Sequence, residues 1–96
     1  MLKPKQRAFL RKMANGLDPI FQIGKSGVTP EVVEAVSAAL ETRELVKVSV
    51  LKNCEEELSV CADYLSSRTH SELVRSIGRR FVLYRRAKEP KIELPR

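Results

Sequence analysis

The sequence predicts an α/β fold, a two-layer sandwich with the element order α-β-α-β-α-β-β and a mixed four-stranded sheet. Stretches with helical apolar spacing alternate with short β-branched runs. The run from Leu45 to Leu51 alternates apolar and polar residues, as a half-buried strand does. Near the end, Gly78-Arg79 separates two further strand-like runs, a pair suited to a type II′ hairpin. The 96 residues, 43% hydrophobic and 31% charged, suit a single globular domain.

The first predicted helix runs from about Pro4 to Asn15. A helical wheel places its apolar residues on one side, which we expect to be buried: Phe9, Leu10, Met13, Ala14 and Leu17. A turn at Asp18-Pro19 leads into a short strand from Ile20 to Ile23. The second helix runs from Pro30 to about Arg43, with Thr29 as its N-cap.

The second half continues the alternation. Asn53 and Glu56 resemble a capping box for the third helix. The apolar stripe of that helix consists of Leu58, Cys61, Ala62 and Leu65. Strands are predicted at Glu72 to Ile77 and Arg80 to Arg86, and helices are expected to cover one face of the sheet. Residues 1–88 form the predicted domain, and residues 89–96 form an extended tail that we expect to be loosely held.

A G-K-S-G loop joins the first strand to the second helix. Gly24 and Gly27 let the backbone approach a ligand closely, Lys25 adds a positive charge, and the following helix start favours an anion. The loop can therefore hold a phosphate of a nucleotide or of a nucleic acid. A nucleotide-hydrolysing P-loop is disfavoured, because Pro19 stands where its first glycine is required. The alternative for this loop is a plain strand-to-helix turn.

Charge is strongly segregated along the chain, which has a formal net charge of +6. Residues 1–27 carry six basic side chains and one acid, and residues 75–96 carry eight basic side chains and two acids. Between them, residues 28–74 carry four basic and nine acidic groups. This distribution predicts a cationic face built from both ends of the chain, suited to binding phosphates. Arginines at the hairpin add planar donors, although the segment lacks the glycine and aromatic spacing of an RNA recognition motif.

Several classes of function are disfavoured. The sequence contains no paired-carboxylate or Cys-His arrangement, so we expect no enzyme activity, no metal and no cofactor. Cys54 and Cys61, placed seven residues apart on one predicted helix, are expected to be reduced packing residues. A membrane span and a signal peptide are both missing, which predicts a cytoplasmic location.

In combination, five segments resemble the bacterial YhbY-type CRM domain (chloroplast RNA splicing and ribosome maturation) over nearly the whole chain. They are Lys5-Gln6-Arg7-Ala8-Phe9-Leu10-Arg11, Asn15-Gly16-Leu17-Asp18-Pro19, Ile23-Gly24-Lys25-Ser26-Gly27-Val28-Thr29, Glu44-Leu45-Val46-Lys47-Val48 and Ile77-Gly78-Arg79-Arg80-Phe81-Val82-Leu83-Tyr84-Arg85. The resemblance implies an RNA-binding domain with a fold similar to the C-terminal domain of translation initiation factor 3. It also implies association with precursors of the large ribosomal subunit. The family often has glycine where this chain has Ser26.

The sequence therefore predicts a non-catalytic RNA-binding protein that binds ribosomal RNA and assists ribosome assembly. RNA is expected to lie across the first helix, the G-K-S-G loop and the basic hairpin end. The predicted RNA-binding residues are Lys5, Arg7, Arg11, Lys12, Gly24, Lys25, Ser26, Gly27, Arg79, Arg80, Arg85 and Arg86. An alternative of another class is a protein–protein adaptor that uses the acidic run Glu55-Glu56-Glu57 on the third helix.

Overall fold

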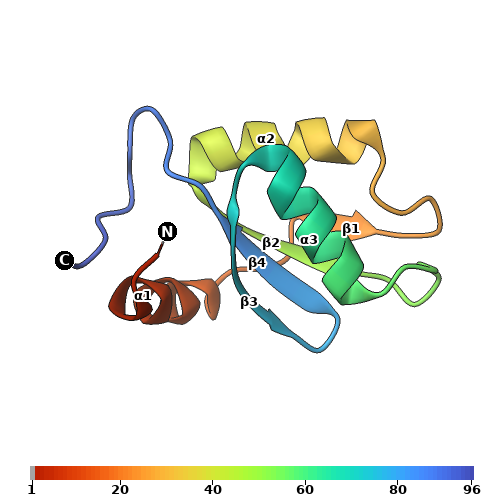
Figure 1. The fold of residues 1–96 in the computed structure, drawn as a ribbon, viewed down its shortest axis with the longest axis horizontal. Coiled ribbons are helices and arrows are strands. Elements are labelled where there is room, and N and C mark those ends of the chain that lie inside the picture. Colours follow the sequence, from red (N-terminus) through yellow and green to blue (C-terminus); the bar gives the residue numbers. More distant parts are fainter. Residues whose placement is uncertain (1) are drawn as a thin grey trace.

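A computed structural model describes residues 2–96 and contains seven helices and strands in the predicted order (Figure 1). They are α1 (Pro4–Ala14), β1 (Phe21–Ile23), α2 (Pro30–Arg43), β2 (Leu45–Val50), α3 (Leu58–Thr69), β3 (Glu72–Ile77) and β4 (Arg80–Tyr84). The strands form one sheet in the order β1-β2-β4-β3. β1 is parallel to β2, whereas β4 is antiparallel to both β2 and β3. The predicted α/β class and mixed four-stranded sheet are confirmed.

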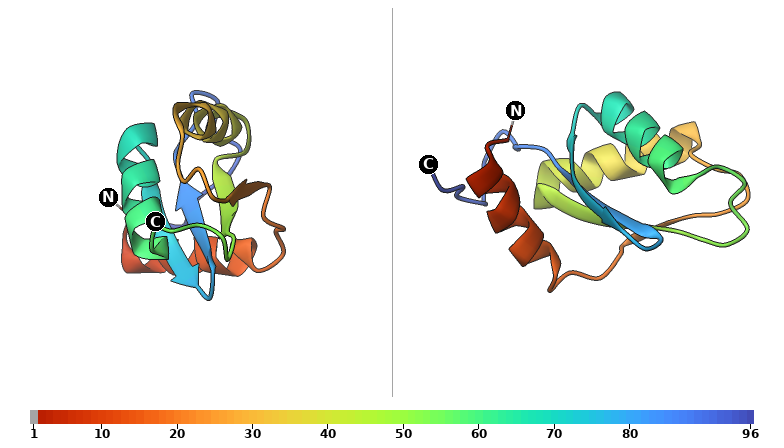
Figure 2. Two further views of the ribbon diagram at one scale, coloured as in Figure 1. Left: turned by 90° about the vertical axis from the view of Figure 1, so that its right-hand side faces the viewer. Right: turned by 60° about the horizontal axis from the view of Figure 1, so that its bottom comes forward.

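The main core lies between one face of the sheet and the layer formed by α2 and α3 (Figures 1 and 2). The alternation predicted for β2 is correct, because Val46, Val48 and Val50 all point into this core. α2 and α3 contribute Val36, Leu40 and Leu65 to it, and β4 contributes Phe81 and Leu83. Burial of these aliphatic and aromatic side chains supplies most of the favourable free energy of folding.

α1 packs on the opposite face of the sheet, where it forms a second, smaller core (Figure 2). Leu10 and Ala14 contact a cluster made by Leu45, Val74, Val82 and Tyr84. The expectation that helices cover one face is therefore correct for α2 and α3 and wrong for α1. The predicted apolar side of α1 is also partly wrong, because Phe9 is 38% exposed and Met13 is 40% exposed. The contact with the sheet is narrow and covers only the centre of the apolar stripe.

α3 starts later than its capping signal predicts. Its first residue is Leu58 and its N-cap is Glu57, so the predicted cap at Asn53 is wrong. A turn comes first, in which the Cys54 N–H donates to the Leu51 carbonyl over 3.1 Å. The side chain of Asn53 instead lies beside Gly24. Helix capping propensity was overridden here by contacts with a distant loop.

The hairpin between β3 and β4 turns at Gly78-Arg79, as predicted. Gly78 has φ = +59° and Arg79 has no positive φ, which agrees with a type II′ turn. However, β4 ends at Tyr84 and does not extend to Arg86. Arg79 and Arg85 therefore lie at opposite ends of β4, and the predicted grouping of four arginines at one hairpin end is wrong.

The C-terminal segment is held by Glu44, a buried residue directly after α2. Glu44 has φ = +65°, and its carboxylate accepts hydrogen bonds from the backbone N–H groups of Ala87, Lys91 and Ile92. Ile92 and Leu94 also pack against the second core. The expectation of a loosely held tail is wrong, because the Glu44 carboxylate binds the tail. Local sequence patterns do not reveal a hydrogen bond between residues 47 positions apart.

None of the helices in residues 2–96 has the length and apolar content needed to cross a membrane.

Replacing Glu44 with Gln tests the role of this buried carboxylate. One carboxylate oxygen accepts from Ala87 and the other from Lys91 and Ile92, so an amide must place its NH2 group against an N–H donor. We expect Glu44→Gln to lower the free energy of unfolding by about 2–3 kcal/mol in urea denaturation. A loss below about 0.5 kcal/mol would contradict the proposed anchoring of the tail.

The same carboxylate gives stability a defined pH dependence. Burial alone would raise the pKa of Glu44, but hydrogen bonds from Ile92, Lys91 and Ala87, together with nearby Arg86, lower the pKa below its ordinary value of 4.5. The contribution of the ionised Glu44 carboxylate to the stability of the fold is complete above pH 4.5. It disappears as the pH falls through the lowered pKa of the folded state. The free energy of unfolding of the Glu44→Gln variant should therefore fall less on acidification than that of the wild type. An identical pH profile for both proteins would argue against this.

Candidate nucleic-acid interface

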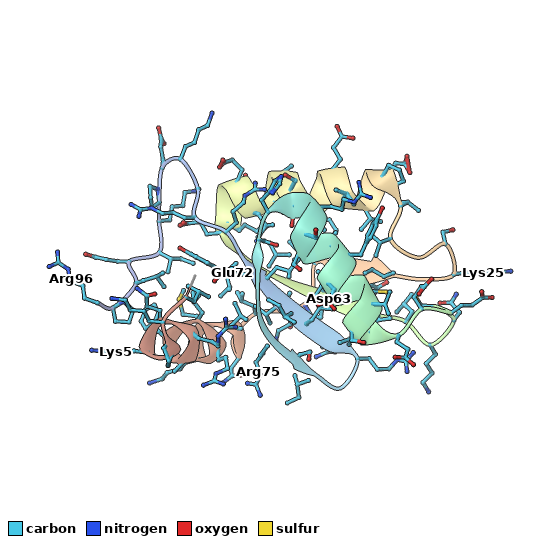
Figure 3. The ribbon with its side chains drawn as sticks, in the orientation of Figure 1. Lys5, Lys25, Asp63, Glu72, Arg75 and Arg96 are labelled. Carbon is cyan, nitrogen blue, oxygen red and sulfur yellow. The ribbon has the colours of Figure 1, made fainter. Side chains whose placement is uncertain are left out.

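The G-K-S-G loop forms a tight turn between β1 and α2. The N–H of Gly27 donates to the carbonyl of Gly24 over 3.0 Å, and Gly27 has φ = +69°, a conformation that favours glycine. The Thr29 hydroxyl accepts from the Val32 N–H over 3.2 Å, so the predicted N-cap is confirmed. Lys25 and Ser26 are exposed at the tip of the turn. This loop projects from the end of the molecule, as the label of Lys25 in Figure 3 shows.

Three segments meet at this end of the sheet. Because β1 and β2 are parallel, both finish there, and β4 begins there after the hairpin turn. The Leu51 N–H donates to the Ile23 carbonyl over 2.9 Å, and the Val50 N–H donates to the Arg79 carbonyl over 2.7 Å. We call this region the loop end and define it as residues 24–27, 51–54 and 78–80.

Gly24 is closely packed within the loop end. A Cβ atom at this position would lie 3.4 Å from Oδ1 of Asn53 and 3.7 Å from a methyl carbon of Leu51. A methyl group here would therefore make ordinary van der Waals contact with the neighbouring 51–54 segment. The first glycine lies beside the 51–54 segment, whereas the second permits a left-handed turn.

Four basic side chains are exposed at the loop end: Lys25, Lys52, Arg79 and Arg80. Arg79 is oriented by two backbone carbonyls, with Nε 3.1 Å from the Val50 oxygen and Nη2 3.0 Å from the Leu51 oxygen. Within residues 2–96, no side-chain hydrogen bond or ion pair engages Lys25 or Arg80. These cations can therefore meet phosphates without first breaking an internal bond.

The acidic run Glu55-Glu56-Glu57 also lies near the loop end. It precedes α3, so the predicted location on the helix itself is wrong. These carboxylates and Arg79 line a shared hollow of about 340 Å³. Their negative charge disfavours phosphates in that hollow.

The basic residues of α1 are not brought to the loop. Lys5 and Lys25 lie at opposite ends of the molecule, whose longest dimension is 39 Å (Figure 3). Lys5, Arg11 and Lys12 are exposed. Arg7 instead donates to the carbonyls of Leu73 and, over 3.1 Å, of Val74, where β3 has an irregular register against β4. Arg7 thus fastens α1 to β3.

Arg85 and Arg86 lie at the far end of β4. Arg85 joins the two helices of the main layer, because its guanidinium donates to the Ser37 hydroxyl (3.0 Å), the Ser37 carbonyl (2.7 Å) and the Thr69 carbonyl (2.8 Å). Arg86 is exposed near the C-terminal segment and lines a hollow there with Tyr84 and Lys91. The predicted residues thus fall into three places: the loop end, α1 and the far end of β4.

Two basic residues that the prediction omitted, Lys47 and Arg75, lie on the sheet between these places. Val82 pairs with both of them across neighbouring strands, so the three side chains share one face. The polar positions of β2 alternate, which does indicate that Lys47 points away from the main core. Nothing local to β3 indicates that Arg75 lies near it, because the register depends on an irregularity between Leu73 and Arg75.

The two cysteines are free thiols with their sulfur atoms 4.0 Å apart. The two cysteines are therefore reduced, as expected, although the premise that both lie on one helix is wrong, because Cys54 precedes α3. Burial, together with the neighbouring Cys54, raises the pKa of Cys61 to about 11, which keeps this thiol protonated and weakly nucleophilic. In residues 2–96, His, Cys, Asp and Glu side chains form no group of three that could hold a metal ion.

Comparison with known proteins identifies the family. The CRS1 / YhbY (CRM) domain matches residues 2–85. The chain belongs to the CRM domain family. This CRM domain is 51% identical, over 99% of the chain and 100% of the relative, to a Bacillus subtilis protein named as a probable RNA-binding protein, YqeI. It is 36% identical to a protein of Haemophilus influenzae named as an RNA-binding protein, with 99% of the chain and 96% of the relative covered.

The fold of this CRM domain also matches a solved structure. The solution structure of SAV1595 from Staphylococcus aureus superposes with a TM-score of 0.83 at 48% sequence identity. The match covers 99% of this chain and 100% of the other. The predicted membership of the YhbY-type family and the predicted fold class are therefore both confirmed.

Arg85 and Arg80 should differ sharply in their effect on stability. Arg85→Ala removes three hydrogen bonds that join α2 to the end of α3, so we expect a loss of about 1.5–3 kcal/mol in urea unfolding. Arg80→Ala removes an exposed side chain and should change stability by less than about 0.5 kcal/mol. Equal effects of the two substitutions would contradict the structural role of Arg85.

Proposed function

We propose that this protein binds RNA through the loop end without catalysing a reaction. The observation that carries the proposal is that the Gly24–Gly27 turn and the Gly78–Arg80 hairpin turn lie at the same end of the sheet, each beside the end of β2 or the segment that follows it. This arrangement places Lys25 and Arg80, neither held by another residue in 2–96, beside backbone that a ligand can approach closely. The relatives named as RNA-binding proteins and the CRM domain match support RNA as the partner.

The loop contributes shape and charge. Gly27 permits the left-handed turn that exposes the tip, and Lys25 neutralises a phosphate lying over it. Glu31 occupies the first turn of α2, so the end of that helix alone is a poor anion site. We therefore assign the phosphate to the tip of the loop and to the Arg79-Arg80 side.

We further propose that the RNA is ribosomal RNA in precursors of the large subunit, bound in the cytoplasm during ribosome assembly. This part rests on the resemblance to the YhbY-type family. Phosphate contacts made by Lys and Arg are strong at low salt and reversible, which suits a factor that holds RNA and then leaves. Crosslinking to RNA in cells followed by sequencing tests this assignment: recovery of large-subunit precursor RNA is expected, and recovery of unrelated messenger RNA alone would overturn it.

The adaptor function makes a different prediction. Binding through Glu55-Glu56-Glu57 would require a protein partner and would not involve phosphates. RNA binding should weaken steeply as salt increases, with a linear fall of log affinity against log salt concentration. Salt-insensitive binding to a protein, together with no RNA binding by the intact chain, would favour the adaptor.

Reversing the charge of Lys25 tests the proposed site directly. Lys25→Glu replaces an attraction to phosphate by a repulsion at an exposed position, so we expect at least about a tenfold loss of affinity for structured ribosomal RNA in filter binding, equal to about 1.4 kcal/mol. Lys88→Glu makes the same charge change at an exposed position of the C-terminal segment and serves as the matched control.

Gly27→Asp should also weaken binding, but it carries a second effect. The left-handed φ of Gly27 makes any side chain there strained, so circular dichroism and urea unfolding must accompany this variant.

Equal losses of affinity for Lys25→Glu and Lys88→Glu would show that only net charge matters. Unchanged binding by a folded Lys25→Glu protein would remove the loop from the interface.

A further inference from the structure

One part of the sheet face that carries α1 remains uncovered by helices. The strand register identifies the side chains on this open face, because they alternate with Phe21, Ile23, Val48, Val50 and Phe81, which face the main core. They are Gln22, Lys47, Ser49, Arg75, Ile77 and Arg80. We call these six residues the open sheet face. It carries three cations and no acidic residue.

The three cations are spread over three strands. Lys47 and Arg75 flank Val82 in the ladder, so their Cα atoms lie about 10 Å apart, twice the spacing of neighbouring strands. Arg80 is two residues from Val82 along β4, or about 7 Å. Together they form a triangle across three strands and not a single line.

The charged groups of this triangle are available to a ligand. Val82 is only 2% exposed and lies between Lys47 and Arg75 in the ladder. Both of these side chains are half-buried, so their aliphatic stems lie against the protein while their charged ends reach solvent. Within the described chain, no hydrogen bond or ion pair engages the side chain of Lys47, Arg75 or Arg80. Phosphates can therefore replace water around all three.

The open sheet face also connects two regions that the fold separates. Arg80 belongs to the loop end, and Arg75 lies on β3 close to the bulge where Arg7 of α1 is fastened. In Figure 3 Arg75 appears between Lys5 and Lys25, and the right-hand view of Figure 2 shows the sheet between α1 and the loops. The open sheet face thus extends from Arg80 at the loop end to Arg75, near the contact of α1 with β3.

We propose that the open sheet face binds the phosphate backbone of a double-stranded RNA stem whose neighbouring segment is held at the loop end. The proposal rests on the RNA-binding function proposed above. Sheets that bind single strands stack unpaired bases on aromatic side chains, and this face has none. Cations spread in two dimensions suit phosphates from both strands of a helix, which proteins recognise by shape and backbone contacts.

The test uses two glutamine substitutions, Lys47→Gln and Arg75→Gln, made together in the full chain. Glutamine removes the charge and keeps part of the aliphatic stem beside Val82. Lys88→Gln provides the matched control, because Lys88 is exposed and lies outside the open sheet face. The probes are a 16-base-pair RNA hairpin and an unpaired RNA of 16 nucleotides, each titrated at several salt concentrations.

For the hairpin, the double variant should bind at least about tenfold more weakly than the wild type at 0.1 M salt. Its slope of log affinity against log salt should be shallower by about 1.4–1.8, the loss of two phosphate contacts. The unpaired RNA should be affected less, and Lys88→Gln should resemble the wild type. Urea unfolding verifies that both variants are folded.

The outcomes separate this inference from the proposed function. A wild-type protein that binds neither probe would overturn both. Binding that Lys25→Glu abolishes and the double variant leaves unchanged would overturn only the role of the open sheet face. A loss confined to the unpaired RNA would overturn the assignment to a double-stranded stem.

Discussion

The parallel pairing of β1 with β2 places the glycine loop at the same end of the sheet as the segment that follows β2. β1 has only three residues. Its register, with Ile23 opposite Val50, brings the C-terminal ends of β1 and β2 to the same end of the sheet. The Ile20 N–H extends this pairing to the Lys47 carbonyl, and the Leu51 N–H closes it at Ile23. α2 provides the crossover that a parallel pair requires. If this short ladder shifted, the glycine loop would move away from Asn53 and from the hairpin turn.

Charged residues have two distinct uses in this chain. Glu44, Arg7 and Arg85 are bound internally and join segments that are far apart in sequence: the C-terminal segment to α2, α1 to β3, and α2 to α3. Such bonds stabilise a small protein whose two cores are modest in size. Within residues 2–96, no such bond engages the side chain of Lys25, Arg80, Lys47 or Arg75, whereas Arg79 is held by the carbonyls of Val50 and Leu51. A high content of Lys and Arg alone therefore does not define an interface.

The sequence was sufficient where local chemistry decides the structure. Thr29-Pro30 predicted the start of α2, alternating valines predicted β2, and Gly78 predicted the hairpin turn. It was insufficient where distant contacts decide. Asn53 has good capping chemistry but lies beside Gly24, 29 residues earlier in the chain. For the site, the glycine loop was found from its own residues. The internal role of Arg85 depends on Ser37 and Thr69, and the position of Arg75 depends on the register of β3, so neither could be derived from a local pattern.

The most direct test of RNA binding at the loop end is to map the RNA-contacting surface by nuclear magnetic resonance. A protein labelled with 15N would be titrated with an RNA hairpin, and the amide shifts would be followed residue by residue. We expect the largest changes in residues 24–27, 52–53 and 78–80, with smaller changes at Lys47 and Arg75. Changes concentrated at Arg85, Arg86 and the C-terminal segment, with the glycine loop unaffected, would contradict RNA binding at the loop end.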